Sequence, residues 1–70
     1  MLKVYVLSAG GNIATDIGRV RKDRSVGDMF KLKSCLYPLH VVGKNETRDE
    51  LFCVHEEDVG RIPFKKELFL

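Results

Sequence analysis

The chain has 70 residues, twelve of them basic and ten acidic, and a formal net charge of +2. A chain of about 60 residues buries only about 60% of its unfolded surface, so residues 1–70 are expected to form a single small domain. A hydrophobic content of 44% excludes a disordered chain, and the near balance of charges gives no general reason to expect a nucleic-acid-binding protein.

The first residues are apolar, but they alternate with Lys3, which suits a β-strand better than the core of a signal peptide. No apolar run approaches the length of about 20 residues that a membrane-spanning helix needs. Two cysteines without a secretory signal predict reduced thiols and a cytoplasmic location, with no membrane partner.

Residues 1–8 are rich in Val, Leu and Tyr and predict a strand that buries Leu2, Val4 and Val6 on one face. A glycine-rich turn over residues 9–12 follows. Its glycines match neither spacing typical of a phosphate-binding loop, so an ordinary turn is the expected structure.

Residues 13–17 fit either a helical turn, because two isoleucines are four positions apart, or a short strand. Residues 18–24 are dense in basic groups and predict an exposed loop or a charged edge strand. The alternative is a nucleic-acid contact over residues 19–33, made by Arg19, Arg21, Lys22, Arg24, Lys31 and Lys33.

After a turn over residues 25–28, the alternation of residues 29–37 predicts a strand. Phe30, Leu32 and Leu36 should face the core, while the intervening lysines face water. The expected elements that follow are a strand over 39–42, a polar hairpin loop over 43–49, a strand over 50–55, a helical or 3-10 turn over 55–59, a short closing strand over 60–63 and an apolar tail over 64–70.

From residue 26 to residue 63 the expected order is strand, kink, strand, polar hairpin, strand, acidic turn and short strand. This order resembles an SH3-like small β-barrel, and LFCVHEEDVGRI over residues 51–62 is similar to that fold's penultimate strand, 3-10 turn and last strand. The resemblance implies a mostly β protein with about five short antiparallel strands and a single helical turn near residues 55–59. Peptide-binding SH3 domains read proline-rich ligands with aromatic grooves that include Trp, and this chain has no Trp, so that activity is not carried over. The size and pattern also resemble small accessory proteins of bacteriophages, which implies no particular site.

Four side chains are candidate metal ligands: Cys35, His40, Cys53 and His55. Zinc sites usually contain a tight pair of ligands such as C-x2–4-C, and the spacing here, C-x4-H-x12-C-x-H, has none. Cysteine also serves as a small core residue. The sequence therefore predicts no metal and no cofactor, and it leaves open whether these side chains converge. A Cys–His nucleophile pair is a further possibility, but no Ser-centred elbow, H-E-x-x-H or paired-carboxylate motif supports it, so we expect no enzyme.

The remaining expectation is a binding protein that acts on another protein as an adaptor, modulator or inhibitor. The candidate partner-binding residues are acidic: Glu46, Asp49, Glu50, Glu56, Glu57 and Asp58. Nucleic-acid binding through the basic residues is the first alternative. A structural subunit that uses residues 64–70 as a joint is the second, although docking of this tail on its own domain is the favoured interpretation of the segment.

Overall fold

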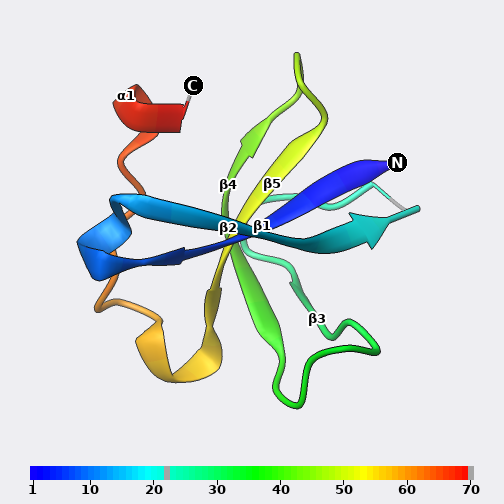
Figure 1. Ribbon diagram of the computed structural model, residues 1–70, viewed down its shortest axis with the longest axis horizontal. Coiled ribbons are helices and arrows are strands. Elements are labelled where there is room, and N and C mark those ends of the chain that lie inside the picture. Colours follow the sequence, from blue (N-terminus) through cyan, green and yellow to red (C-terminus); the bar gives the residue numbers. More distant parts are fainter. Residues whose placement is uncertain (22, 70) are drawn as a thin grey trace.

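The computed structural model describes residues 1–21 and 23–69 and has a mostly β fold, as the sequence predicts. The elements are β1 (Leu2–Ser8), η1 (Ala9–Gly11), β2 (Ile13–Val20), β3 (Met29–Phe30), β4 (Leu39–Asn45), β5 (Glu50–His55), η2 (Glu56–Asp58) and α1 (Lys66–Phe69). The label η marks a one-turn 3-10 helix. Figure 1 shows β1, β2, β4 and β5 crossing near the centre of the molecule, with β3 at the lower right and α1 at the upper left.

The five strands form one mixed sheet in the order β2-β1-β5-β4-β3. Three neighbouring pairs are antiparallel, whereas β1 and β5 are parallel. The expectation of an entirely antiparallel set is therefore wrong for this pair. No hairpin links β1 to β5, and the chain passes through three other strands before it returns beside β1, so hairpin geometry does not dictate their direction.

The sheet does not close, because β2 and β3 are its two edges. It is strongly twisted, as sheets generally are, and in Figure 1 β1 and β2 pass across β4 and β5. Leu32, just after β3, lies 3.6 Å from the place that a Cβ on Gly18 of β2 would take. The two edges approach each other through side chains and not through paired backbone, and the SH3-like resemblance stays a prediction.

The hairpin of β1 and β2 follows the sequence closely at its first strand. Leu2, Val4 and Val6 are buried, as predicted. Residues 13–17, for which a helical turn and a strand were both open, belong to a strand. Pairing with β1 along nearly its whole length outweighs the helical spacing of the two isoleucines, since tertiary context routinely overrides local preference.

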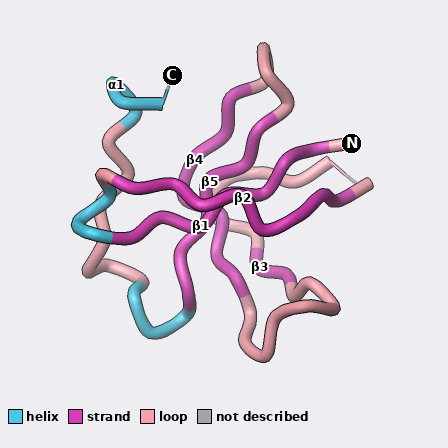
Figure 2. Tube along the Cα trace, viewed as in Figure 1, coloured by secondary structure: helices cyan, strands magenta, loops and turns pink. Residues whose placement is uncertain are grey.

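The strand expected over residues 29–37 is mostly wrong, because only β3 is paired with β4. The chain then turns, with the Cys35 amide donating to the Leu32 carbonyl oxygen at 3.0 Å. Phe30 is buried and Leu32 partly buried, but Leu36 is 84% exposed and does not reach the core. Figure 2 shows this long loop between β3 and β4. Alternating residues fit a loop as well as a strand when no neighbouring strand pairs with them.

The strands after this loop differ from expectation at two points. β4 extends to Asn45 and so includes the first three residues of the polar loop expected over 43–49. β5 has the predicted bounds, and η2 is the predicted one-turn segment. Residues 60–63, however, form a turn in place of a closing strand. The amides of Arg61 and Ile62 both donate to the Asp58 carbonyl oxygen, at 2.9 and 3.2 Å, so the turn continues past η2.

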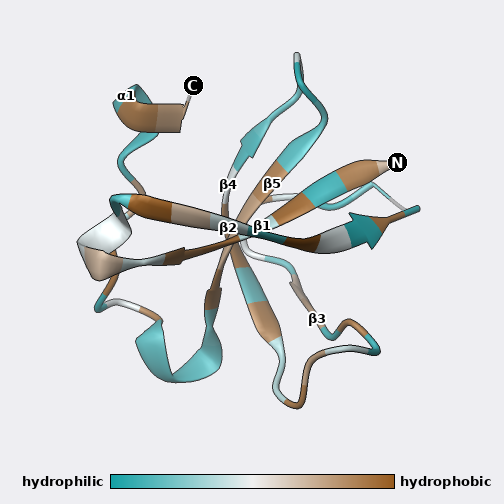
Figure 3. Cartoon of the chain, viewed as in Figure 1, coloured by the Kyte–Doolittle hydropathy of each residue, from teal (hydrophilic) through white to brown (hydrophobic). Residues whose placement is uncertain are grey.

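The core has two parts because β5 is buried on both faces. Leu51 and Cys53 face the larger part, which also contains the buried residues of β1 and β4, while Phe52 and Val54 face a smaller one. A central strand covered on both sides is continuously apolar in this way, and Figure 3 shows the hydrophobic colouring at the crossing of β1 and β5. Phe64 and Phe69 of the tail cover the smaller part, which confirms that the tail docks on its own domain.

Candidate functional site

The six acidic candidate residues form two groups at opposite ends of β5. Glu46 and Asp49 lie in the loop before this strand and Glu50 begins it, whereas η2 follows its end. Six residues of strand separate the groups by about 20 Å. The structure therefore does not bring the six acidic residues together in a single surface.

The second group meets another segment because of the register between β4 and β5. Leu39, the first residue of β4, pairs with His55, the last residue of β5. The residues just before β4 consequently lie beside η2. An open hollow of about 360 Å³ between them is lined by Tyr37, His55, Glu56 and Glu57. These four residues, together with the adjacent Leu36, are called the Tyr37 surface below.

The Tyr37 surface combines exposed apolar and acidic groups. Leu36 is 84% and Tyr37 is 67% exposed. Glu56 and Glu57 are also exposed, and within residues 1–21 and 23–69 neither makes an ion pair. In Figure 3 the turn after β5 has the hydrophilic colour and the loop before β4 carries hydrophobic segments. Tyr37 thus stands in water beside carboxylates without a described ion pair, and Leu36 is exposed next to it in the chain, so neither side chain contributes to the core.

Local sequence explains why the loop takes this form. Proline has no amide hydrogen, so Pro38 cannot extend the ladder that begins at Leu39. The residue before a proline is biased toward an extended backbone, which holds Tyr37 out of any helical turn. On the other side, His55 is the N-terminal flanking residue of η2 and has extended φ and ψ of −65° and 153°. The residues that precede β4 and those that follow β5 therefore lie side by side, because Leu39 pairs with His55.

The sequence interpretation missed Leu36 and Tyr37 and included only the acidic half of this surface. Leu36 was assigned to the core on the basis of its alternation with neighbours in residues 29–37. The Tyr-Pro pair directly before a short apolar strand is the signal that could have identified Tyr37 as a residue outside the sheet.

The basic candidate residues are partly engaged within the chain. The Arg19 Nη1 atom lies 2.8 Å from the Asp16 Oδ1 atom and 3.0 Å from the Gly18 carbonyl oxygen. The Arg24 guanidinium stands 5.0 Å from the centre of the Phe30 ring, at cation–π distance. The remaining basic candidates that can be described are exposed, namely Arg21, Lys31 and Lys33; Lys22 lies outside the described residues.

The cysteine and histidine candidates do not form a metal site among residues 1–21 and 23–69, where no group of three or more potential ligands is suitably placed. Cys53 is fully buried in the larger core, and this burial raises the pKa of its thiol to about 12. The thiolate is the reactive form of cysteine, so Cys53 is unsuited to nucleophilic chemistry at neutral pH. Cys35 is partly exposed and, with His55, borders a hollow beside β1 and β2.

Comparison of the chain with protein-family models, with curated proteins and with solved structures found no match. Of the helices in the described part of the chain, none has the length and hydrophobicity to cross a membrane.

Proposed function

We propose that this protein is a small non-enzymatic binding protein that acts on a partner protein through the Tyr37 surface, as an adaptor, modulator or inhibitor. The observation that carries the proposal is the exposed Tyr37 beside Glu56 and Glu57 around an open hollow. Aromatic side chains are enriched at the centres of protein interfaces, where they supply much of the binding free energy.

The chemistry of the Tyr37 surface also describes its partner. Leu36 and Tyr37 would be covered by apolar side chains, and Glu56 and Glu57 would pair with lysine or arginine at the edge of the contact. Complementary charges of this kind mainly accelerate association and select the partner. We therefore expect a partner with an apolar patch bordered by basic residues. The unpaired thiols of Cys35 and Cys53 fit a reducing compartment, and we include a cytoplasmic location in the proposal.

The test is affinity capture from the native host with matched variants. One variant is Tyr37→Ala, and a second is the double substitution Glu56→Gln and Glu57→Gln. The control is Glu46→Gln with Asp49→Asn, which removes the same charge at the other end of β5. The first two should weaken the capture of a specific protein by about tenfold or more, as central interface substitutions do, while the control retains it. Equal capture by all three variants would reject the Tyr37 surface.

Nucleic-acid binding is a second candidate because Arg21, Lys31 and Lys33 are exposed. It predicts an affinity for single-stranded or duplex DNA that falls steeply between about 50 and 200 mM salt, because binding releases counterions from the phosphates and this release gains less free energy at higher salt. Replacing these three residues by Ala should reduce that salt dependence. If the affinity and its salt dependence are unchanged, these residues do not form the contact.

A further inference from the structure

Residues 63–69, called the segment below, cover an aromatic face of the sheet. This face lies on the side of β5 opposite the larger core. The Phe52 ring lies 5.7 Å from Tyr5, 5.2 Å from Phe64 and 5.1 Å from Phe69, measured between ring centres. Phe64 and Phe69 are themselves 6.2 Å apart. All four distances fall within the range of favourable aromatic pairs. The surface formed by Tyr5, Phe52 and Gly43 is called the Phe52 face below.

The Phe52 face contains a slot shaped for one of these rings. A Cβ atom on Gly43 would overlap the ring of Phe64, so only glycine admits the ring there. Gly43 lies at an irregularity of β4, where the pairing with β5 shifts register between Val41 and Gly43. Bulges of this kind commonly re-aim a strand next to a functional site.

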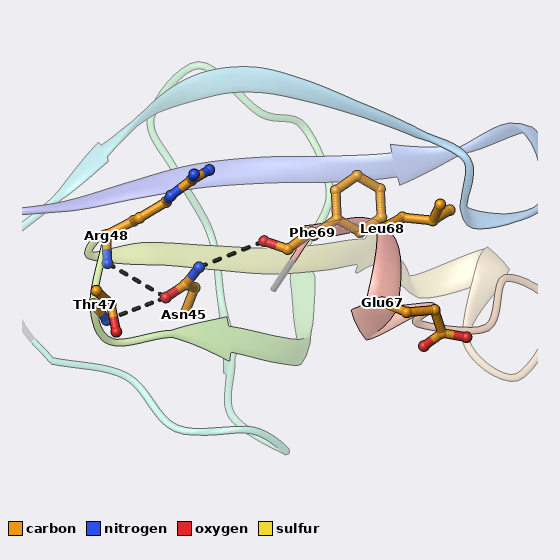
Figure 4. Close-up of a pocket in the computed structure, with 6 residues that line it drawn as sticks. All are labelled: Asn45, Thr47, Arg48, Glu67, Leu68 and Phe69. Atoms are coloured by element: carbon orange, nitrogen blue, oxygen red, sulfur yellow. Dashed lines mark hydrogen bonds between the residues drawn. The ribbon is translucent and has the colours of Figure 1, made fainter.

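Few polar contacts hold the segment in place. Its described backbone amides donate no hydrogen bond to the sheet; the Leu68 amide bonds within the segment, to Lys65. Two side-chain bonds reach the rest of the molecule. The Asn45 Nδ2 atom donates to the Phe69 carbonyl oxygen at 3.4 Å, as drawn in Figure 4, and the Lys65 Nζ atom donates to the Asn12 Oδ1 atom at 3.1 Å.

The helix in this segment depends on the docking of its aromatic rings. α1 has four residues, far fewer than the length at which isolated helices become stable in water. Ordering residues 63–69 costs conformational entropy, which the burial of Phe64 and Phe69 must offset. Leu68 stays 55% exposed, and open hollows border the segment on the side of Arg48. The packing of Phe64 and Phe69 against Phe52, and few polar contacts, hold residues 63–69 on the aromatic face.

We propose that the Phe52 face is a second binding surface, and that a segment of a partner protein occupies it in place of residues 63–69. The partner segment is amphipathic and carries two aromatic side chains five positions apart with lysine between them, because this is the chemistry that the face accepts from its own chain. The tail then acts as an intramolecular competitor, whose high effective concentration sets the threshold for binding. The Tyr37 surface has no part in this proposal. It lies at η2 and the loop before β4, away from α1 in Figure 1.

The direct test uses the full chain with Phe64→Ala and Phe69→Ala, which empties the face. A synthetic peptide with the sequence of residues 63–69 is titrated into this variant and into the unsubstituted protein, and binding is followed by amide chemical shifts of Tyr5 and Phe52. The dissociation constant should be at least about tenfold lower for the variant, since the competing tail no longer docks. A peptide with both phenylalanines replaced by alanine should bind neither protein. A folded variant that does not bind the first peptide overturns the proposal.

Trypsin cleavage of the unsubstituted protein tests the proposal even if that variant fails to fold. Opening of the tail alone exposes little surface, so the rate of cleavage after Lys66 should hardly change in dilute urea. Cleavage after Arg19 within β2 should instead show the full urea dependence of global unfolding. If cleavage after Lys66 shows the same dependence as cleavage after Arg19, the tail opens only with the whole domain, and the proposal is wrong. Dimerisation of the emptied variant through the same face, without peptide, would also overturn it by assigning the face to a second copy of the chain.

Discussion

Phe52 packs against three aromatic rings from two separate parts of the chain, namely Tyr5 in β1 and Phe64 and Phe69 in the tail. It is 2% exposed and is the largest fully buried side chain of the described residues. Leu36 is a comparably large apolar residue that the sequence pattern places in the core and the structure places in water. Comparing substitutions of Phe52 and Leu36 therefore measures how much burial of a single side chain contributes to the free energy of unfolding.

Replacing Phe52 by Ala should lower the free energy of unfolding by about 3–5 kcal/mol, because the substitution loses buried apolar area and leaves a cavity. The matched change Leu36→Ala should alter it by no more than about 0.5 kcal/mol, as exposed substitutions usually do. Urea unfolding followed by circular dichroism measures both. A loss of more than about 2 kcal/mol for Leu36→Ala would contradict the exposed position of this side chain.

Cys53 makes stability depend on pH in the alkaline range. Its thiol keeps its proton in the folded state up to a pKa of about 12, whereas in the unfolded chain it ionises near 9.0. Above that lower value the unfolded state loses a proton that the folded state retains, so the free energy of unfolding falls as pH rises. The slope for this group is about 1.4 kcal/mol per pH unit.

The measurement is urea unfolding at about pH 8 and about pH 10.5 for three proteins. The unsubstituted protein and Cys35→Ala should lose about 2 kcal/mol more over this interval than Cys53→Ala does. Equal losses in all three would mean that Cys53 is accessible to water in the folded state.

Among the elements, β2 is an edge strand whose outer side is protected by its own side chains. The Asp16 Oδ1 atom accepts from the Gly18 amide at 3.1 Å and from the Arg19 guanidinium at 2.8 Å. The Arg19 hydrogen bond is the largest of several influences that hold the pKa of Asp16 below its ordinary value. The two hydrogen bonds that Asp16 accepts form a cap over the edge of β2. This cap is consequently intact at neutral pH and is lost only as acid protonates the carboxylate. Capped and charged edges resist pairing with other chains.

Asp16→Ala should therefore promote self-association through β2, since it frees the Gly18 amide and removes the charge. Thr15→Ala, at an adjacent exposed position of the same strand, is the control. Light scattering over a concentration series should show association for Asp16→Ala at concentrations where the control stays monomeric. Identical behaviour of the two variants would mean that the cap does not protect the edge.

The predictability of each element depended on how local its determinants are. β1 and β5 were predicted within one residue of their observed bounds, because polar or glycine-rich turns delimit them and each has one partner in an adjacent hairpin. Residues 31–37 were misassigned because their alternation has no paired strand to satisfy it. The parallel pairing of β1 with β5 joins distant parts of the chain, and no local pattern of residues encodes it.

For the whole molecule, the Tyr37 surface has one half that a local sequence pattern predicted and one half that depends on contacts between distant parts of the chain. The acidic turn was visible in the sequence as a charge run. The exposure of Tyr37 follows from the place where β4 begins and from the pairing of Leu39 with His55, which are properties of the assembled sheet. The loop at the other end of β5 has as many acidic residues, but it also contains Arg48, and Glu46 lies 3.6 Å from the Lys44 Nζ atom. We therefore propose the partner contact at the η2 end of β5, where Tyr37 is exposed.

The most direct test of that assignment is chemical-shift mapping on the isotopically labelled protein with its captured partner. We expect the largest amide shifts at residues 36–38 and 55–58, with little change in residues 46–49 at the opposite end of β5. Shifts confined to residues 46–49 or to the basic segment 19–33 would contradict the central claim that the Tyr37 surface binds the partner.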